Sequence, residues 1–288
     1  MKIAVLSGKG GTGKTLVSVN LASVASDATY VDCDVEEPNG HLFFKPLEVV
    51  VEEVLVPVPI VDAQLCDRCR VCVNFCRFNA LALSGDKIRL FENICHSCGG
   101  CVLVCPQKAI SEVGRRIGSI ERGRSGAVQV ISGFLDPGEA SGIPIIHQLL
   151  KHAEQSHSDM TFIDCPPGSA CVVMESIKGA DYCVLVAEPT IYGAHNLALV
   201  HQLVSLFAKP YGVILNKCLD ADNPSEIYCK ENGLVIIGSI AFDHDLGKLN
   251  SDARVASHED ERYHGLFADL LLGIREEVQH ATATDIKR

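Results

Sequence analysis

The stretch Gly8-Lys9-Gly10-Gly11-Thr12-Gly13-Lys14-Thr15 decides the fold of this 288-residue chain. It matches the pattern G-x-x-x-x-G-K-[ST], and it lies between an apolar run at residues 1–6 and a helical pattern at residues 15–25. Glycines let backbone N–H groups converge on phosphate oxygens, and the following helix adds the positive end of its dipole. We therefore predict a phosphate-binding loop in which Lys14 reaches the β- and γ-phosphates and Thr15 ligates Mg²⁺.

Short apolar runs recur along the rest of the chain, with turn residues between them. They lie at residues 28–31, 127–132, 160–164, 182–187, 212–216 and 234–240. Helical patterns, such as residues 145–155, separate several of these runs. Alternation of strands and helices predicts a doubly wound, mostly parallel sheet with helices on both faces. Such sheets bind ligands at the carboxyl ends of their strands, where polar motif residues recur in this sequence.

Composition and charge exclude several classes of protein. The chain is 47% hydrophobic, and its net charge of −11 disfavours nucleic acid or an anionic membrane as a partner. The apolar run at residues 3–6 is too short for a signal-peptide core. Apolar residues at helical spacing in 266–274 have net acidic flanks, so we expect this helix to pack on the sheet. We expect a cytoplasmic protein that binds no nucleic acid and makes no stable membrane contact.

Eight of the fourteen cysteines lie in two runs of the same spacing. The runs are Cys66-x2-Cys69-x2-Cys72-x3-Cys76 and Cys95-x2-Cys98-x2-Cys101-x3-Cys105. This duplicated spacing resembles that of the bacterial two-cluster ferredoxins. The resemblance implies two [4Fe–4S] clusters. It also implies that the fourth cysteine of each run, which a helix carries away from the first three, is a ligand of the other cluster. One cluster would be held by Cys66, Cys69, Cys72 and Cys105, and the other by Cys95, Cys98, Cys101 and Cys76. Two structural zinc sites are the alternative, although zinc usually prefers paired C-x2-C units.

The cysteine runs interrupt the alternation of strands and helices, which predicts an inserted domain. We expect the ATPase-type α/β domain at residues 1–61 and 113–288, and an α+β domain of the bacterial ferredoxin type at residues 62–112. Residues 49–61 contain Pro57 and Pro59, so we predict an extended arm or an edge strand there. Residues 115–126 are rich in Arg, Gly and Ser, which favours a flexible return from the insertion.

A second lysine, Lys9, directly follows the first glycine of the phosphate-binding loop. This order resembles the deviant phosphate loop of the MinD/ParA/Mrp/nitrogenase-iron-protein superfamily. The resemblance implies that Lys9 reaches across a dimer to the partner's bound phosphates, so that dimerisation and ATP hydrolysis are coupled. The dimer would be a homodimer, or a heterodimer with a paralogue. A solvated loop cation is the alternative role for Lys9.

Strand-end motifs extend this resemblance. Asp32-Cys33-Asp34 resembles the segment in which the second Asp positions the attacking water, so Asp34 is the expected catalytic residue and Asp32 its support. Asp164-Cys165-Pro166-Pro167-Gly168 resembles the switch II motif. There Asp164 would hold the Mg²⁺ shell, and Gly168 would sense the γ-phosphate through its N–H. Asn216 resembles the residue that reads adenine.

Two further cysteines lie in or after the predicted switch II, where a nitrogenase iron protein keeps a cluster ligand. Cys165 or Cys171 could bridge an intersubunit cluster, but we favour a structural role because buried strand-end cysteines are common.

Taken together, the motifs resemble MinD-superfamily ATPases with an inserted ferredoxin domain, including those encoded beside the molybdenum–copper orange protein. The resemblance implies an ATPase that binds ATP or ADP with Mg²⁺ and couples dimerisation to two clusters. These would serve electron transfer, or assembly of an Fe–S or Mo-type metallocofactor, on a partner protein. The alternatives are a MinD/ParA-like spatial regulator with structural or sensing clusters, and an iron–sulfur cluster carrier.

Overall fold

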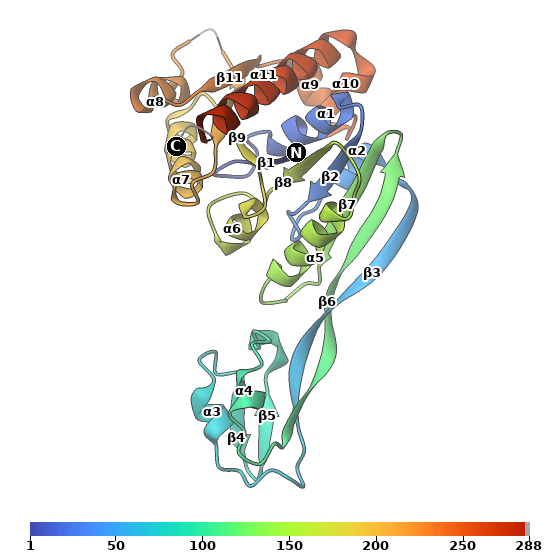
Figure 1. Cartoon of the computed structure of the whole chain (residues 1–288), viewed down its shortest axis with the longest axis vertical. Helices are drawn as coiled ribbons and strands as arrows, with labels where there is room; N and C mark the ends of the chain where they lie inside the picture. The colour runs from blue at the N-terminus through green and yellow to red at the C-terminus, as the bar shows by residue number, and fades with distance from the viewer. Residues whose placement is uncertain (220, 286–288) are drawn as a thin grey trace.

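The structure is a computed structural model that describes residues 1–219 and 221–285, with side chains up to residue 280. A nine-stranded sheet carries helices on both faces, and a cysteine-rich segment lies at the end of a long two-stranded ribbon (Figure 1). The strands of the sheet are, in spatial order, β11 (Ile236–Ala241), β10 (Tyr211–Cys218), β9 (Tyr182–Ala187), β1 (Lys2–Leu6), β8 (Met160–Asp164), β2 (Ala28–Asp32), β7 (Val128–Leu135), β6 (Ile110–Ser125) and β3 (Leu47–Val61).

The sheet is mostly parallel, as the alternation of strands and helices predicts. All neighbours from β11 to β7 pair in parallel, and each of these strands coincides with a predicted apolar run. At one edge β6 pairs antiparallel with β7, and β3 pairs antiparallel with β6. Because β3 is the last strand of the sheet, the prediction of an edge strand for residues 49–61 is confirmed.

Two hydrophobic cores lie on opposite faces of the sheet. One face is covered by α5 (Ile143–Glu154), α6 (Cys171–Ile177), α7 (Ile191–Leu206) and α8 (Pro224–Asn232). The other is covered by α1 (Lys14–Val24), α2 (Gly40–Phe44), α9 (His244–Ser251), α10 (Ala256–Glu259) and α11 (Glu261–Asp285). Phe267, Leu270 and Ile274 are buried against the sheet, which confirms the packing predicted for the last helix. Among the described residues, no helix has both the length and the apolar character that crossing a membrane requires.

The cysteine-rich segment between β3 and β6 has short elements and a small core. Its elements are α3 (Val71–Phe75), β4 (Leu81–Ser84), β5 (Lys87–Leu90), a 3₁₀ turn (Glu92–Ile94) and α4 (Gly100–Leu103). Strands β4 and β5 form a separate two-stranded sheet. Only Cys72, Leu81 and Ile110 form its buried cluster among the described residues. So small a core leaves the segment dependent on other interactions for its stability.

The prediction of a flexible return at residues 115–126 is wrong, because residues 115–125 belong to β6. Three of its four arginines, Arg115, Arg116 and Arg122, lie beside carboxylates. Arg116 lies 3.6 Å from Glu53 of β3, and Arg122 lies 3.7 Å from Glu52. Arginines close to glutamates of the neighbouring strand stabilise the antiparallel pairing, so Arg, Gly and Ser form a strand here.

Gly118 of β6 lies against the backbone of β7, and its replacement by Ala is expected to destabilise the protein. A Cβ atom at this position would lie 2.1 Å from the carbonyl oxygen of Phe134, which cannot move without distorting β7. We expect Gly118→Ala to lower the free energy of unfolding by about 1–3 kcal/mol, measured by chemical denaturation. Gly247→Ala is the matched control, because a Cβ on this helical residue meets open space. An unchanged stability of Gly118→Ala would contradict this packing.

Candidate functional site

The phosphate-binding loop joins β1 to α1 at the carboxyl edge of the sheet. Gly13 adopts a left-handed conformation with φ of 96°, and a Cβ there would lie 2.0 Å from Nδ2 of Asn216. Glycine is therefore required by both backbone conformation and space. Asn216 donates from Nδ2 to the carbonyl oxygen of Thr12 at 2.7 Å. This contact fixes the loop against the end of β10, and the predicted reading of adenine by Asn216 stays a prediction.

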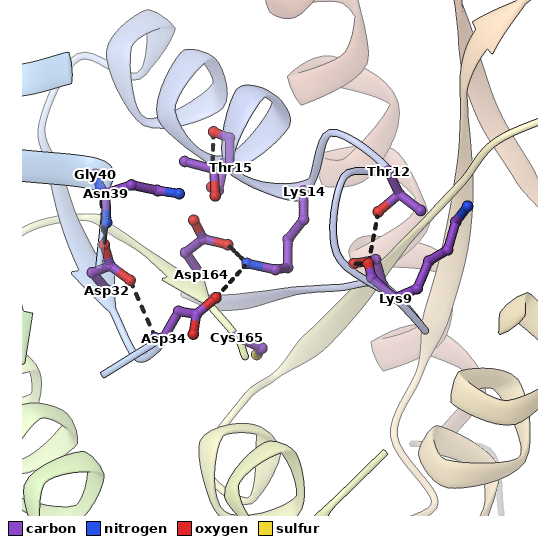
Figure 2. Close-up of polar contacts among 12 residues, drawn as sticks. Lys9, Thr12, Lys14, Thr15, Asp32, Asp34, Asn39, Gly40, Asp164 and Cys165 are labelled. Atoms are coloured by element: carbon purple, nitrogen blue, oxygen red, sulfur yellow. Dashed lines mark hydrogen bonds and ion pairs between the residues drawn. The ribbon is translucent and has the colours of Figure 1, made fainter. Parts of the chain in front are cut away.

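Lys14 lies at the centre of a buried cluster of charges (Figure 2). Its Nζ donates to Oδ1 of Asp164 at 2.7 Å and lies 4.0 Å from Oδ2 of Asp34. Burial alone would lower the pKa of Lys14, but the charge of Asp164 and the hydrogen bond to it raise that pKa. The structure thus brings together three of the four predicted catalytic residues.

Two further groups hold this cluster in place. Asp32 accepts hydrogen bonds from the backbone N–H groups of Asp34, Asn39 and Gly40 at 2.9–3.1 Å, so it shapes the loop after β2 (Figure 2). Tyr30 donates to Oδ2 of Asp164 at 2.8 Å. The sequence analysis missed Tyr30, because a tyrosine inside an apolar strand has the pattern of an ordinary core residue.

The carboxylates of the cluster carry more negative charge than Lys14 can balance. Burial and the charge of Asp164 raise the pKa of Asp32 to about 7, and burial raises that of Asp34 to about 6. A divalent cation would favour the ionised forms. Carboxylate and hydroxyl oxygens are the donors that Mg²⁺ prefers. The residues present therefore fit magnesium, with Asp164 and the Thr15 hydroxyl as its neighbours.

A cavity of about 340 Å³ opens beside this cluster. Its lining includes Gly10, Gly11, Gly13, Lys14, Thr15, Asp34, Asn216 and Phe242. The predicted phosphate sensor Gly168 has its N–H engaged, since it donates to the carbonyl oxygen of Ser7 at 2.9 Å. Contact between this N–H and a γ-phosphate would require that hydrogen bond to break.

Lys9 points away from Lys14 and from the aspartates (Figure 2). Its ammonium forms an ion pair with Glu188, which follows β9. The other oxygen of Glu188 lies 3.9 Å from Nζ of Lys217, and Lys217 donates to the carbonyl oxygen of Gly11 at 2.6 Å. Glu188 thus lies between Lys9 and Lys217, whose ammonium supports the loop, and it restrains Lys9 within the chain.

The eight clustered cysteines line two separate cavities. One, of about 230 Å³, is lined by Cys76, Cys95, Cys98 and Cys101, together with Phe75, Phe78, Pro57 and Pro59. The other is a narrow cavity lined by Cys66, Cys69, Cys72 and Cys105. Each set combines three cysteines of one run with the fourth cysteine of the other run. In the described part of the chain, no three His, Cys, Asp or Glu side chains converge as ligands of a single metal ion.

The fourth cysteine of each run has the same backbone environment. Cys76 accepts a hydrogen bond from the N–H of Ala80, and Cys105 accepts one from the N–H of Ala109, each at 3.3 Å. N–H donors to sulfur stabilise thiolates and tune the potentials of iron–sulfur clusters. Burial raises the pKa of Cys72, so its thiolate form is costly unless a cation neutralises it. Thiolate donors around a cavity fit a cluster better than a hard metal ion.

Comparison with known proteins places this geometry in a family. The pattern of the CobQ/CobB/MinD/ParA nucleotide binding domain matches residues 3–254. The chain belongs to this family. An uncharacterised protein of Methanocaldococcus jannaschii is 32% identical over an alignment of 284 residues, and the alignment covers 92% of this chain and 96% of that protein.

This CobQ/CobB/MinD/ParA family member is similar to a solved structure over most of its length and to a ferredoxin over a short part of it. The septum site-determining protein MinD of Pyrococcus horikoshii, solved with Mg-ADP, has a TM-score of 0.57 at 18% identity and covers 94% of this chain and 93% of that one. This likeness shows a MinD-like fold. A ferredoxin of Pyrobaculum islandicum is 41% identical over 54 residues, which are 18% of this chain and 50% of the ferredoxin.

The remaining cysteines of this family member lie away from the two sets. Cys165 is fully buried in the core beneath the sheet edge, whereas Cys171 is exposed at the start of α6.

Glu188 and Lys217 were missed by the sequence analysis. Their position could have indicated a role, because Glu188 and Lys217 each come directly after a predicted strand, where the ligand-binding residues of α/β sheets lie.

Release of Lys9 from Glu188 gives a testable prediction for this family member. If Lys9 must leave Glu188 to reach a partner's phosphates, Glu188→Gln should favour dimerisation in ATP. We expect about two- to fivefold tighter dimerisation, because a partly exposed ion pair contributes about 1 kcal/mol or less. Analytical ultracentrifugation with a slowly hydrolysed ATP analogue measures this. Glu226→Gln, which removes an ion pair with Lys230 on α8, is the control. Weaker dimerisation of Glu188→Gln would show that Glu188 serves another purpose.

Proposed function

We propose that the protein hydrolyses ATP in the loop cavity and uses its nucleotide state to control two [4Fe–4S] clusters. The clusters would exchange electrons with a partner protein, or take part in building a metallocofactor on it. One observation carries this proposal: a single chain holds both the Lys14–Asp34–Asp164 site and two cavities lined by four cysteines each. An ATPase needs no such cysteine sets, and a ferredoxin needs no phosphate-binding loop.

The loop cavity has the groups that ATP hydrolysis requires. Lys14 would exchange Asp164 for phosphate oxygens, which leaves Asp164 free to hold the shell of Mg²⁺. Asp34 lines the cavity and would orient the attacking water and accept its proton. Magnesium supplies neutralisation of the charge that develops on the phosphates. The Mg-ADP bound to the MinD of Pyrococcus horikoshii supports a nucleotide in the equivalent place.

The proposed dimer couples this site to a second chain. Lys9 lies at the rim of the loop cavity with its ammonium on Glu188, so it would become available to a partner's phosphates once released from Glu188. A γ-phosphate that holds two switch segments together is a common origin of nucleotide-dependent conformational change. We propose a homodimer, or a heterodimer with a paralogue.

The cysteine-rich segment fits two clusters. The exchange of the fourth cysteine between the two sets, the N–H donors to Cys76 and Cys105, and the similarity to a ferredoxin all support this assignment. Bound clusters supply one-electron transfer. Metal binding would also stabilise a segment whose own core is small. Such clusters persist in a reducing compartment, for which we propose the cytoplasm.

Purification without oxygen tests the proposal directly. We expect about eight iron atoms and about eight sulfides per chain, a reduced-cluster EPR signal, and a change in that signal on addition of ATP and Mg²⁺. Iron-poor material would remove the iron–sulfur half of the proposal, and failure to bind ATP would remove the other half.

A MinD/ParA-like spatial regulator is the second candidate, because the fold is MinD-like and the family includes such proteins. Binding to anionic vesicles or to DNA in ATP would favour it. The net charge of −11 is unfavourable for either surface.

A further inference from the structure

The β3–β6 ribbon continues well beyond the sheet from which it starts. The last residue pair of β6 and β7 is Gly118 with Leu135, and Gly118 also pairs with Val54 of β3. Residues 55–61 and 110–117 then run on as two paired strands without a third. At about 3.3 Å per residue this overhang is roughly 25 Å long, and the cysteine-rich segment follows it.

The overhang projects from the edge that carries the phosphate-binding loop. Strands β1, β8, β2 and β7 are parallel, so the loop after β1, the aspartates at the ends of β8 and β2, and Leu135 of β7 lie at the same edge. The ribbon leaves the sheet where β7 ends. Figure 1 shows the cysteine-rich segment at the far end of the ribbon, away from the parallel strands. The loop and the segment therefore face the same side of the molecule.

Ion pairs at its base fix the direction of the ribbon. Both terminal nitrogens of Arg115 contact the carboxylate of Glu139 at 2.5 and 2.7 Å, and these two side chains are largely buried. Arg116 lies 3.4 Å from Asp136, whose N–H donates to the carbonyl oxygen of Ile117 at 2.9 Å. A bidentate arginine–carboxylate pair restricts orientation strongly. The ribbon is therefore a braced arm and not a free hinge.

The lateral position of the ribbon leaves room for a second copy of the chain. Four strands separate β1 from β3, which places the ribbon about 24 Å to the side of the loop. A compact body of about 240 residues, the size of this chain without the cysteine-rich segment, has a radius of about 23 Å. If a second copy of the chain lay over the phosphate-binding loop, the ribbon would therefore run along the side of that copy. The overhang would reach to about the middle of the second copy.

We infer that, in the nucleotide-bound dimer, the cysteine-rich segment of each protomer docks against the flank of the other protomer. The inference rests on the proposed ATP-dependent dimer and adds a specific contact between its two protomers. The docking surface would include the rim around Cys76, Cys95, Cys98 and Cys101, where Phe75 and Phe78 are 47% and 41% exposed. Dimerisation would then bring the cysteine-rich segment of each protomer against its partner. Binding of nucleotide would in this way change the environment of the clusters.

Photo-cross-linking between two distinguishable copies tests this inference. One copy carries p-benzoylphenylalanine at position 91 or, separately, at position 103, because Phe91 and Leu103 are exposed on different elements of the segment. The other copy is labelled with ¹⁵N, so that mass spectrometry identifies peptides joined between copies. Both copies carry Asp34→Asn to preserve ATP, and iron-loaded protein is used without oxygen. The photoreactive residue at position 272, exposed on α11, is the control.

The expected result is at least a tenfold gain, in ATP over ADP, of cross-links from positions 91 and 103 to the labelled copy, with no such gain from position 272. Light scattering on the same samples reports the dimer independently. A dimer in ATP without cross-links between copies from either position would overturn the inference and leave the proposed function standing. Absence of any ATP-dependent dimer would overturn the proposed coupling, and the inference with it.

Discussion

Replacement of Asp34 by Asn is expected to slow ATP hydrolysis about 100- to 10,000-fold, the effect commonly produced by loss of a general base. Asp34 lines the loop cavity and lies 4.0 Å from the ammonium of Lys14. The amide keeps the size of the side chain but cannot accept a proton from water. Nucleotide binding should remain, because Lys14 and the loop backbone are unchanged. Single-turnover hydrolysis, together with equilibrium binding of ATP, separates these two effects.

The pH dependence of the rate provides a second readout of the same residue. Burial raises the pKa of Asp34 to about 6, and a base acts only in its ionised form. As pH falls through this value the carboxylate of the free protein is protonated, so the wild-type kcat/KM, which reports the free protein, should fall about tenfold for each unit below it. The residual rate of Asp34→Asn should lack this decline. Rates measured between about pH 5 and pH 8 test this.

A neighbouring carboxylate supplies the control for both measurements. Glu37 also lines the cavity, but its side chain is exposed. Glu37→Gln should keep the rate within a few-fold and preserve its decline at low pH. If Asp34→Asn kept more than about a tenth of the wild-type rate, Asp34 would not be the base.

Replacement of Cys105 by Ser is expected to remove one cluster and to spare the other. Iron should fall from about eight to about four atoms per chain, because each [4Fe–4S] cluster needs four ligands. Cys105 lines the cavity of Cys66, Cys69 and Cys72, although it belongs to the other run in sequence. Cys171→Ser is the control, since Cys171 is exposed on α6 and lies outside both sets. Iron analysis and EPR of the reduced protein measure the outcome.

Double substitutions show which cysteines share a cluster. Combining Cys105→Ser with Cys66→Ser should cost no more iron than either change alone, because both remove ligands of one cluster. Combining Cys105→Ser with Cys95→Ser should remove nearly all the iron. If instead Cys105→Ser with Cys66→Ser removed nearly all the iron, and Cys105→Ser with Cys95→Ser cost no more iron than either change alone, each run would bind its own cluster. The proposed exchange of the fourth cysteines would then be wrong.

Local chemistry made much of the fold and the site predictable from sequence. The loop Gly8–Thr15 has a recognisable motif with glycines at the positions of positive φ, and short apolar runs marked every parallel strand. Asp164 ends one such strand and Asp34 follows another, so parallel pairing brought both to Lys14 at one edge.

Interactions between distant segments were less predictable. The Arg-rich stretch after the cysteines has the composition of a linker, and its carboxylate partners Glu52 and Glu53 lie more than sixty residues earlier. The ion pair of Lys9 with Glu188 joins two strand ends that are adjacent only in the folded sheet. Patterns within a window of sequence contain no information on such pairs.

The two prolines of β3 have a consequence for the solubility of this chain. A long strand at the edge of a sheet offers unpaired N–H and C=O groups to any other extended chain, and Val49, Val50 and Val51 add exposed apolar surface. Pro57 and Pro59 have no N–H to offer, and Glu48, Glu52 and Glu53 place like charges along the same strand. These residues oppose pairing of this edge with another extended chain, and so oppose growth of the sheet into fibrils.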